Sequence, residues 1–327
     1  EQFSKKCMQS VFRYTKEWEH LTERIGFWVN LDEAYVTYHK SYVESVWWAL
    51  SKLFEQGLLY QGHKVVWWWA QGGTALSSGE VGGSYKTVDA PSPYVRFPLV
   101  DEDASLAIWT TTPWTLPSNM FTGVHPEFDY SYAKDDSEGG SGETLVIAEG
   151  LRVALEDKLG RKLTVQKTVK GAELVGKRYR PPFDTYREFA DDERYFRVVP
   201  GNKASAGTPQ WFVTLDAGTG LVHIAPAFGE ADWKVWRNEM QKDRELDMFC
   251  AVKPDGTFDE RLAPWELEDV WVKDGDKKLI KALEASGMLI HFENYRHEYP
   301  FCWRAPTDPL IQYARSAWFV RTTERID

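Results

Sequence analysis

The middle of the chain, from about residue 90 to residue 288, alternates short apolar stretches with turn-forming residues. Short stretches rich in β-branched and aromatic residues, bounded by Gly, Pro, Asp or Ser, are typical of strands. Many short strands in one region favour a closed or sandwiched β architecture. The strands that we predict are Tyr94–Leu99, Ala104–Trp109, Phe128–Ala133, Thr144–Ala148, Leu163–Val169, Tyr195–Val199, Trp211–Leu215 and Gly220–Ala225.

Helices are predicted before this region and within it, which makes the fold class α+β. Residues 3–25 have amphipathic helical spacing, and Ser41-x-x-Glu44 predicts a capping box for a second helix that ends at Gly57. Each of these helices is apolar on one face, so we expect a stem that packs against a partner. The chain starts in helical sequence without Met, which indicates a piece of a longer protein. Within the strand region, helices are expected at Leu151–Leu159, Glu230–Gln241 and Asp276–Ser286, a hairpin turn at Asp255-Gly256 and a flexible loop at Lys134–Glu143.

Composition excludes several classes of protein. No apolar run approaches the about 20 residues of a membrane span, and no secretory signal is visible at the start. Three scattered cysteines are too few for a disulfide framework and fit a reducing cytosol. The net charge of −10 argues against indiscriminate nucleic-acid binding. Residues 151–182 are an exception, with nine Lys or Arg against three acids, and form either a solvated face or a weak nucleic-acid-facing patch.

The first candidate site is Trp109–Asn119, with the sequence W-T-T-T-P-W-T-L-P-S-N. Three threonines end an apolar run, and Pro113 cannot continue a strand because it lacks an N–H. Thr110, Thr111 and Thr112 are therefore expected where a strand breaks, with hydroxyls and freed backbone groups available to a ligand. The structural alternative is that these threonines only fill a strand, since Thr favours strands.

The second candidate site is Gly218–Trp233, G-T-G-L-V-H-I-A-P-A-F-G-E-A-D-W. His223 lies in a short apolar stretch that Pro226 and Gly229 end, and Asp232 falls in the first turn of a predicted helix. Both residues have structural alternatives. A histidine in an apolar strand can be a satisfied core residue, and an acid in a first helical turn interacts favourably with the helix dipole.

Together the two segments resemble the editing insert, connective polypeptide 1, of the isoleucyl-tRNA synthetases. The threonine-rich element of that family has the same sequence as the one here, whereas valyl and leucyl relatives carry Arg in the position of Thr112. His223 and Asp232 are in register with the family's other editing element. Further matches are T-E-R-I-G-F-W-V-N-L-D at 22–32, Y-V-E-S-V-W-W-A-L at 42–50, Tyr299–Arg304 and W-F-V-R-T-T at 318–323, so the resemblance covers nearly the whole chain.

The resemblance implies a β-barrel-like editing domain, the fold shared by the Val, Ile and Leu tRNA synthetases, on a helical stem. It divides the chain into a stem (1–62), the first half of a degenerate zinc-ribbon-like module (63–89), the editing domain (90–290), and a return segment with the module's second half and an exit strand (291–327).

In the family, two C-x-x-C pairs of this module bind structural zinc. Here their positions hold Trp69, Gly72, Cys302 and Ala305. One thiol is not a tetrahedral site. We therefore expect no zinc or other metal, and apolar packing around Trp67, Trp68, Trp69 and Trp303 in its place.

The resemblance implies hydrolysis of valine mischarged onto isoleucine tRNA, after transfer. Its catalytic residues would be Thr110, Thr111, Thr112 and Asp232, and its substrate-binding residues Trp109, His223 and Asp232. Asp232 would hold the α-ammonium, the threonines the water or the terminal ribose, and His223 would bind the ribose or exclude isoleucine. The synthetase signatures H-I-G-H and K-M-S-K-S are absent, as are phosphate-binding and nucleophile-elbow motifs. ATP and magnesium are therefore expected only in the missing synthetic domain.

A hydrophobic pocket discriminates poorly against a side chain one methylene smaller, and a second, smaller pocket can admit valine alone. The expected partners are the acceptor end of tRNA(Ile) carrying valine and the remaining synthetase domains. No membrane is expected, and the protein is expected to be cytoplasmic and monomeric. Three alternatives remain: an acceptor-end binding module that is inactive without the synthetase body, a structural part whose site has decayed, and a threonine-editing domain of a valyl enzyme, against which Thr112 argues.

Overall fold

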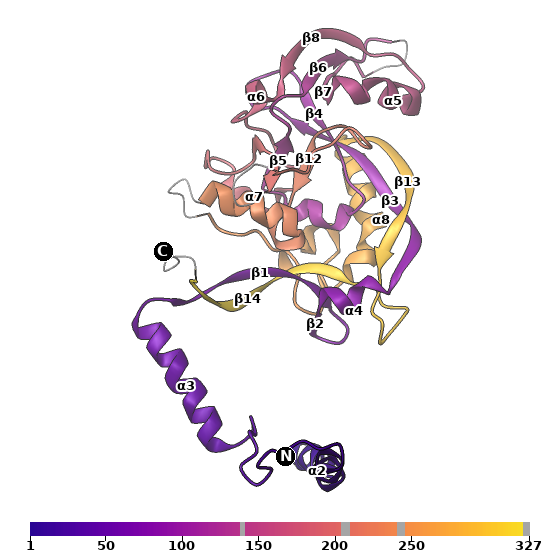
Figure 1. The fold of residues 1–327 in the computed structure, drawn as a ribbon. Coiled ribbons are helices and arrows are strands. Elements are labelled where there is room, and N and C mark those ends of the chain that lie inside the picture. The colour runs from indigo at the N-terminus through magenta and orange to yellow at the C-terminus, as the bar shows by residue number, and fades with distance from the viewer. Residues whose placement is uncertain (138–140, 204–209, 241–245, 323–327) are drawn as a thin grey trace. The chain divides into compact units, whose positions relative to one another are not determined.

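A computed structural model describes residues 1–137, 141–203, 210–240 and 246–322 of the chain. The chain forms two compact units, Glu1–Gly62 with Ala317–Asp327, and His63–Ser316 (Figure 1). The predicted division into four parts stays a prediction. Part of the predicted loop Lys134–Glu143 and the last residue of the predicted helix Glu230–Gln241 lie outside the described residues.

Over its described residues, the N-terminal unit contains three helices, α1 (Gln2–Val11), α2 (Thr15–Arg24) and α3 (Lys40–Glu55). The prediction of one helix over 3–25 was wrong, because the chain leaves helical geometry between α1 and α2. The Ser41 capping box was also wrong: Ser41 is inside α3, where its carbonyl accepts the Ser45 hydroxyl. None of the three helices buries a residue, and Trp28 is 98% exposed.

The larger unit contains a ring of paired strands. Its members are β3 (Tyr85–Pro98), β4 (Ser105–Trp109), β12 (Val222–Ile224), β5 (Phe121–Val124) and β9 (Arg197–Pro200). Pairing alternates between antiparallel and parallel around this order. Single bridges complete the ring, since Arg178 pairs with Arg197 and Tyr179 pairs with Leu99. This mixed, barrel-like arrangement with helices agrees with the predicted fold class.

Both faces of β4 and of the second half of β3 are buried, which explains the unbroken apolar stretch before the threonines. Val95 and Phe97 on β3, and Leu106 on β4, belong to the main core inside the ring. Tyr94 and Ala107 alternate with them and point into a second cluster. A strand whose two faces are both covered is expected to be apolar throughout.

The second cluster lies under a further layer attached to β4. There β7 (Thr144–Ala148) pairs with β4, β6 (Asp129–Lys134) with β7, and β8 (Thr164–Lys170) with β6. The helix α5 (Glu149–Leu159) packs on this layer (Figure 1). On the other side of the ring, β13 (Leu289–Pro300) pairs with β3, and α8 (Val272–Ala285) packs against both.

The remaining elements are short or peripheral. The strand predicted over Trp211–Leu215 was mostly wrong, because only Gln210–Trp211 (β11) pairs, with β10 (Asn202–Lys203). Asp255-Gly256 forms the predicted turn, with Val252 bridging Phe258. The others are β1 (Leu59–Trp69), β2 (Thr74–Leu76), β14 (Ile311–Val320), α4 (Ser78–Gly82), α6 (Gly171–Leu174), α7 (Glu230–Met240), and the 3-10 helices η1 (Pro113–Ser118), η2 (Asp184–Phe189), η3 (Pro226–Phe228) and η4 (Glu260–Trp265).

The structure does not set a zinc-ribbon-like module apart. Trp67 and Trp69 pack against a small apolar cluster that includes Cys302, and Trp68 belongs to the main core, as expected. Trp303 differs from the prediction, since it is 51% exposed. Within the described ranges, no three His, Cys, Asp or Glu side chains gather as metal ligands, and no helix is long and apolar enough to cross a membrane. The expectation that no zinc binds here stays a prediction.

The basic window at 151–182 is largely neutralised by ion pairs with acids elsewhere in the chain. Lys167 and Lys177 both pair with Glu102, and Arg161 pairs with Asp135. Lys158 and Lys170 likewise pair with Glu293 and Asp129. The structure therefore favours the solvated-face interpretation of this window over a nucleic-acid-facing patch.

Candidate active site

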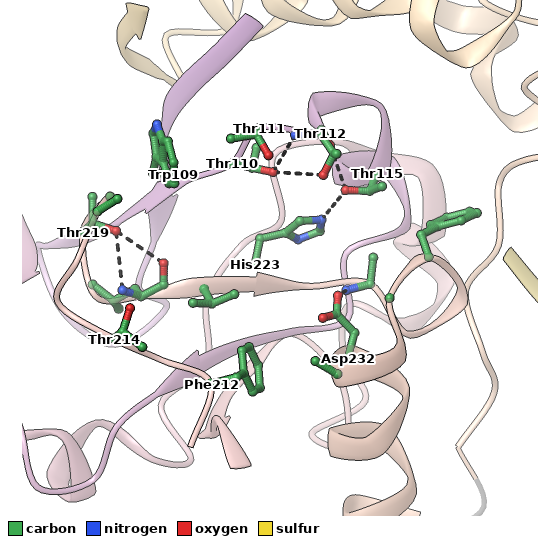
Figure 2. Close-up of a pocket in the computed structure, with 18 of the residues that line it drawn as sticks. Trp109, Thr110, Thr111, Thr112, Thr115, Phe212, Thr214, Thr219, His223 and Asp232 are labelled. Atoms are coloured by element: carbon green, nitrogen blue, oxygen red, sulfur yellow. Dashed lines mark hydrogen bonds between the residues drawn. The ribbon is translucent and has the colours of Figure 1, made fainter. Parts of the chain in front are cut away.

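One pocket of about 640 Å³ is lined by every residue that the sequence singled out as a site residue. These are Trp109, Thr110, Thr111, Thr112, His223 and Asp232. Figure 2 shows His223 between the threonines on one side and Asp232 on the other. Two segments about a hundred residues apart in the sequence therefore form a single site.

The pairing of β4 with β12 brings the two segments together. These strands are parallel neighbours, with Trp109 in register with Val222. Parallel strands place their carboxyl ends at the same edge of a sheet, so the threonines after β4 emerge beside His223. Pro113 then ends the strand and begins η1, because it lacks an N–H and its fixed φ suits a first helical position.

The three threonines form a tight turn. The Thr112 N–H donates to the Thr110 hydroxyl oxygen at 3.1 Å, and the two hydroxyl oxygens lie 3.3 Å apart. Thr110 is buried, whereas Thr111 and Thr112 are half-buried at the pocket wall. Among the described residues, the Thr111 hydroxyl makes no hydrogen bond, so it is available to a ligand.

His223 is held at both ring nitrogens. The Asn119 amide donates to Nδ1 at 2.8 Å, and the same amide nitrogen donates to the Phe121 carbonyl, which fixes its orientation. The Thr115 hydroxyl donates to the Thr112 carbonyl at 2.8 Å, so it accepts from His223 Nε2 at 2.9 Å. Burial lowers the pKa of His223 to about 3. The ring is therefore neutral at physiological pH, with its proton on Nε2.

Asp232 lies in the first turn of α7. Its Oδ2 accepts the Ala225 N–H at 2.9 Å. Burial raises the pKa of Asp232 to about 7, and the hydrogen bond from Ala225 opposes that rise. The Gln312 side chain accepts the Glu230 N–H at 2.7 Å and so fixes the start of the same helix.

Two glycines let these side chains take their places. A Cβ on Gly229 would lie 2.8 Å from Cγ of Asp232, so any side chain there would push the carboxyl group aside. A Cβ on Gly218, whose φ is +77°, would lie 2.7 Å from the Trp109 ring. Trp109 is further held by the Tyr295 ring, edge-on at 5.0 Å.

The sequence analysis did not assign several residues that shape the pocket. Thr115 and Asn119 stand inside the quoted threonine segment, so proximity in sequence was the available signal. Thr214, Asp216, Lys234 and Gln312 also line the pocket. Lys234 pairs with Glu230 at 2.8 Å. Nothing local in the sequence marks these four residues as part of a site.

The chain as a whole matches a known protein family. A family model described as tRNA synthetases class I (I, L, M and V) matches residues 1–326, and the chain belongs to this family. It is 41% identical to the isoleucine–tRNA ligase of Clostridium kluyveri, over 100% of this chain and 29% of that protein. It is 40% identical to the isoleucine–tRNA ligase of Thermus thermophilus, over 99% of this chain and 28% of that protein. The chain thus spans less than a third of the length of these curated relatives.

Solved structures that resemble the chain include the crystal structure of GlLeuRS-CP1. That match covers 62% of this chain and 99% of the other, at 13% identity and a TM-score of 0.43. The P. knowlesi cytosolic leucyl-tRNA synthetase editing domain matches 64% of this chain and 87% of its own, at 11% identity and a TM-score of 0.39.

Proposed function

We propose that this chain is the editing insert of an isoleucine–tRNA ligase and that its pocket hydrolyses valine esterified to tRNA(Ile) after transfer. One observation carries the proposal. A single pocket brings together three threonines, a neutral histidine and a half-buried carboxylate, in a chain 41% identical to an isoleucine–tRNA ligase.

Asp232 is the proposed anchor for the α-ammonium group of the aminoacyl ester. The half-buried carboxylate of Asp232, which accepts the Ala225 N–H, gains a strong, charge-assisted hydrogen bond from an ammonium group. The bound cation also favours the ionised acid, so it reverses the effect of burial on the pKa of Asp232. The carboxylate thereby selects a charged amino group and fixes the ester carbon relative to the threonines.

Hydrolysis is proposed to depend on positioning rather than on a covalent intermediate. His223 is a poor general base here, because both ring nitrogens are engaged within the protein and its pKa is about 3. The free Thr111 hydroxyl and the Thr112 side chain are the groups that can orient a water or the terminal ribose. An aminoacyl ester is already reactive, so orientation and electrostatic stabilisation of the oxyanion can account for a large acceleration.

His223 is proposed to set the size of the amino-acid subsite. Its ring is fixed from both ends, so it cannot turn away to admit a larger side chain. The rigid wall would accept valine and collide with the additional methylene of isoleucine. A pocket that fits isoleucine cannot strongly reject the smaller valine. A pocket that fits only valine can exclude isoleucine by steric clash, so the two pockets discriminate in opposite directions.

The wider setting is part of the proposal. The partners would be the acceptor end of valyl-tRNA(Ile) and the rest of the ligase, in the cytoplasm, with the ligase acting as a monomer. ATP and Mg²⁺ would be needed only in the synthetic domain, and we expect no zinc at the position of Cys302. Zinc analysis of the purified chain tests the last point, and a stoichiometric metal content would overturn it.

The test is single-turnover hydrolysis of valyl-tRNA(Ile) by the chain, compared with Asp232→Ala and with buffer. We expect rapid ester loss with the wild-type chain and loss at the buffer rate with the variant. Activity that survives Asp232→Ala in full would reject Asp232 as the anchor.

A second candidate is an acceptor-end binding module that is inactive without the synthetase body. The helices of the N-terminal unit support this candidate. Among the described residues they bury no side chain, so their apolar faces are available to pack against a further part of the ligase. Titration of labelled tRNA(Ile) against the inactive chain would support this module if binding is seen without ester loss. Restored hydrolysis in the full-length ligase would then identify what the body supplies.

A further inference from the structure

The 3-10 helix η1 is not capped by the side chain of the residue that precedes it. Thr112 is the residue before the helix, and its side chain makes no capping hydrogen bond. Its hydroxyl lies instead 3.3 Å from the Thr110 hydroxyl, at the pocket wall. Pro113 has no N–H, so the Trp114 N–H is the first donor that requires an acceptor.

That acceptor comes from a distant element. Oδ1 of Asp276, on α8, accepts the Trp114 N–H at 3.1 Å. Asp276 is 5% exposed and does not line the pocket. The two residues are 162 positions apart in the sequence, and α8 packs directly against η1. Burial raises the pKa of Asp276 to about 7, with the Lys273 ammonium and the Trp114 N–H opposing the rise.

We propose that Asp276 is a positioning residue that keeps the Thr112 hydroxyl in the pocket by capping η1 in its place. The inference rests on the proposed function, because it gives a role to an element behind the editing pocket. Asp276 contacts neither the threonine hydroxyls nor the pocket, and acts only through the backbone of Trp114.

The physical basis is a competition for one hydrogen-bond donor. Threonine is itself a favourable residue to cap a helix, and the Thr112 hydroxyl is the nearest alternative acceptor in the sequence. Without Asp276, the Thr112 side chain gains a hydrogen bond by rotating toward the helix, and this rotation takes it away from Thr110. The Thr112 carbonyl also accepts the Thr115 hydroxyl, which accepts from His223, so a shift at Thr112 disturbs both sides of the network.

The decisive experiment is a double-mutant cycle with the intact chain. The variants are Asp276→Leu, Thr112→Val and the two combined, assayed for hydrolysis of valyl-tRNA(Ile). We expect Asp276→Leu to lower kcat about tenfold with little change in KM, because the substrate-binding groups are untouched. The double variant should be no slower than Thr112→Val alone, because Asp276→Leu is expected to act only by displacing the Thr112 hydroxyl.

Two variants separate positioning from general stability. Asp276→Asn keeps a side-chain oxygen as acceptor and should restore activity to within about threefold of wild type. Asp259→Leu is the matched control, because Asp259 caps the 3-10 helix η4 through the Arg261 N–H at 3.0 Å and does not line the pocket. It should lower the melting temperature without lowering kcat. Wild-type kcat in Asp276→Leu, or independent effects that multiply in the double variant, would overturn the proposal.

NMR and amide exchange, which do not depend on hydrolysis, test the role of Asp276 separately from the proposed editing function. With labelled threonine methyl groups, the Thr112 methyl signal should shift in Asp276→Leu and regain its wild-type position in Asp276→Asn. Amide exchange over 113–119 should be faster in Asp276→Leu and return to the wild-type rate in Asp276→Asn. If the wild-type chain hydrolyses nothing but these signals respond, the proposed function fails and the cap stands. An unmoved methyl signal rejects the role of Asp276 whatever the activity.

Discussion

The two sides of the pocket differ in how their polar groups are hydrogen-bonded. On the threonine side, Thr110, Thr112, Thr115, Asn119 and His223 are one another's hydrogen-bond partners, and the histidine is neutral. On the opposite side, the half-buried carboxylate of Asp232 accepts a backbone N–H from Ala225. A satisfied network is rigid and sets shape, whereas an incompletely compensated carboxylate attracts a cation. The contrast assigns shape and orientation to the first side and charge recognition to the second.

The largest effect should come from the carboxylate. Asp232→Ala is expected to lower kcat/KM for valyl-tRNA(Ile) about 100-fold or more, because it leaves the substrate ammonium without its charged partner in the pocket. Thr111→Val should cost only about tenfold, the value of one hydrogen bond that strengthens in the transition state. Single-turnover rates at several chain concentrations provide both numbers. Equal losses in the two variants would remove the distinction between the two sides of the pocket.

The next effect concerns selectivity. His223→Ala should hydrolyse isoleucyl-tRNA(Ile) as well, with the preference for the valyl ester falling at least about tenfold, because one methylene is worth about that much in a fitted pocket. His223→Gln retains bulk and hydrogen-bonding groups and should keep most of the preference. Rates for both esters, measured with each variant, give the ratio. A preference that survives in His223→Ala would locate the size filter elsewhere.

A smaller effect is expected from pH. Below a pH of about 7 the free Asp232 is protonated and has no negative charge to attract an ammonium group, so kcat/KM should rise as pH increases through about 7. Asp232→Asn should flatten that rise, whereas Thr111→Val should lower the curve without moving its midpoint. The profile requires subtraction of uncatalysed ester hydrolysis at each pH. A midpoint that moves with Thr111 rather than Asp232 would contradict the assignment of charge to the α7 side.

The smallest effect is on stability. The pKa of Asp232 is raised in the folded chain, so folding favours its protonated form and this group lowers stability as pH rises from about 4 through about 7. Asp232→Asn should therefore increase the free energy of unfolding by about 1–3 kcal/mol at pH 8 and by almost nothing below pH 4. Urea titrations at the two pH values measure it. Thr115→Val, in contrast, should destabilise the fold at both, by about 1 kcal/mol.

The sequence predicted the site better than it predicted the contacts that hold the site. The strand before the threonines and the helix start near Asp232 are local features, and the family resemblance joined them. The hydrogen bonds of Thr115 and Asn119 to His223 span 108 and 104 positions, and no local pattern encodes them. Asp276 was only the first residue of a predicted helix. Its role depends on α8 packing against η1, which is a tertiary event.

The remaining errors have similar causes. The capping box at Ser41 failed because a Ser-x-x-Glu pattern is equally compatible with a helix interior. The strand β13 was missed because most of its Leu289–Pro300 stretch, from His291 onward, mixes aromatic, charged and other polar residues without a run of β-branched or aliphatic residues. The basic window looked unbalanced because its acidic partners, such as Glu102 and Glu293, lie outside the window in the sequence.

Competition between the two esters in one tube tests the central claim most directly. Valyl- and isoleucyl-tRNA(Ile), each with its own isotope, are mixed with the chain, and the ratio of the two labels left on tRNA is followed over time. The valyl label should disappear first while the isoleucyl label persists, and Asp232→Ala should hold the ratio at its buffer value. Parallel loss of both labels, or a ratio that Asp232→Ala does not change, would contradict an editing site built from these residues.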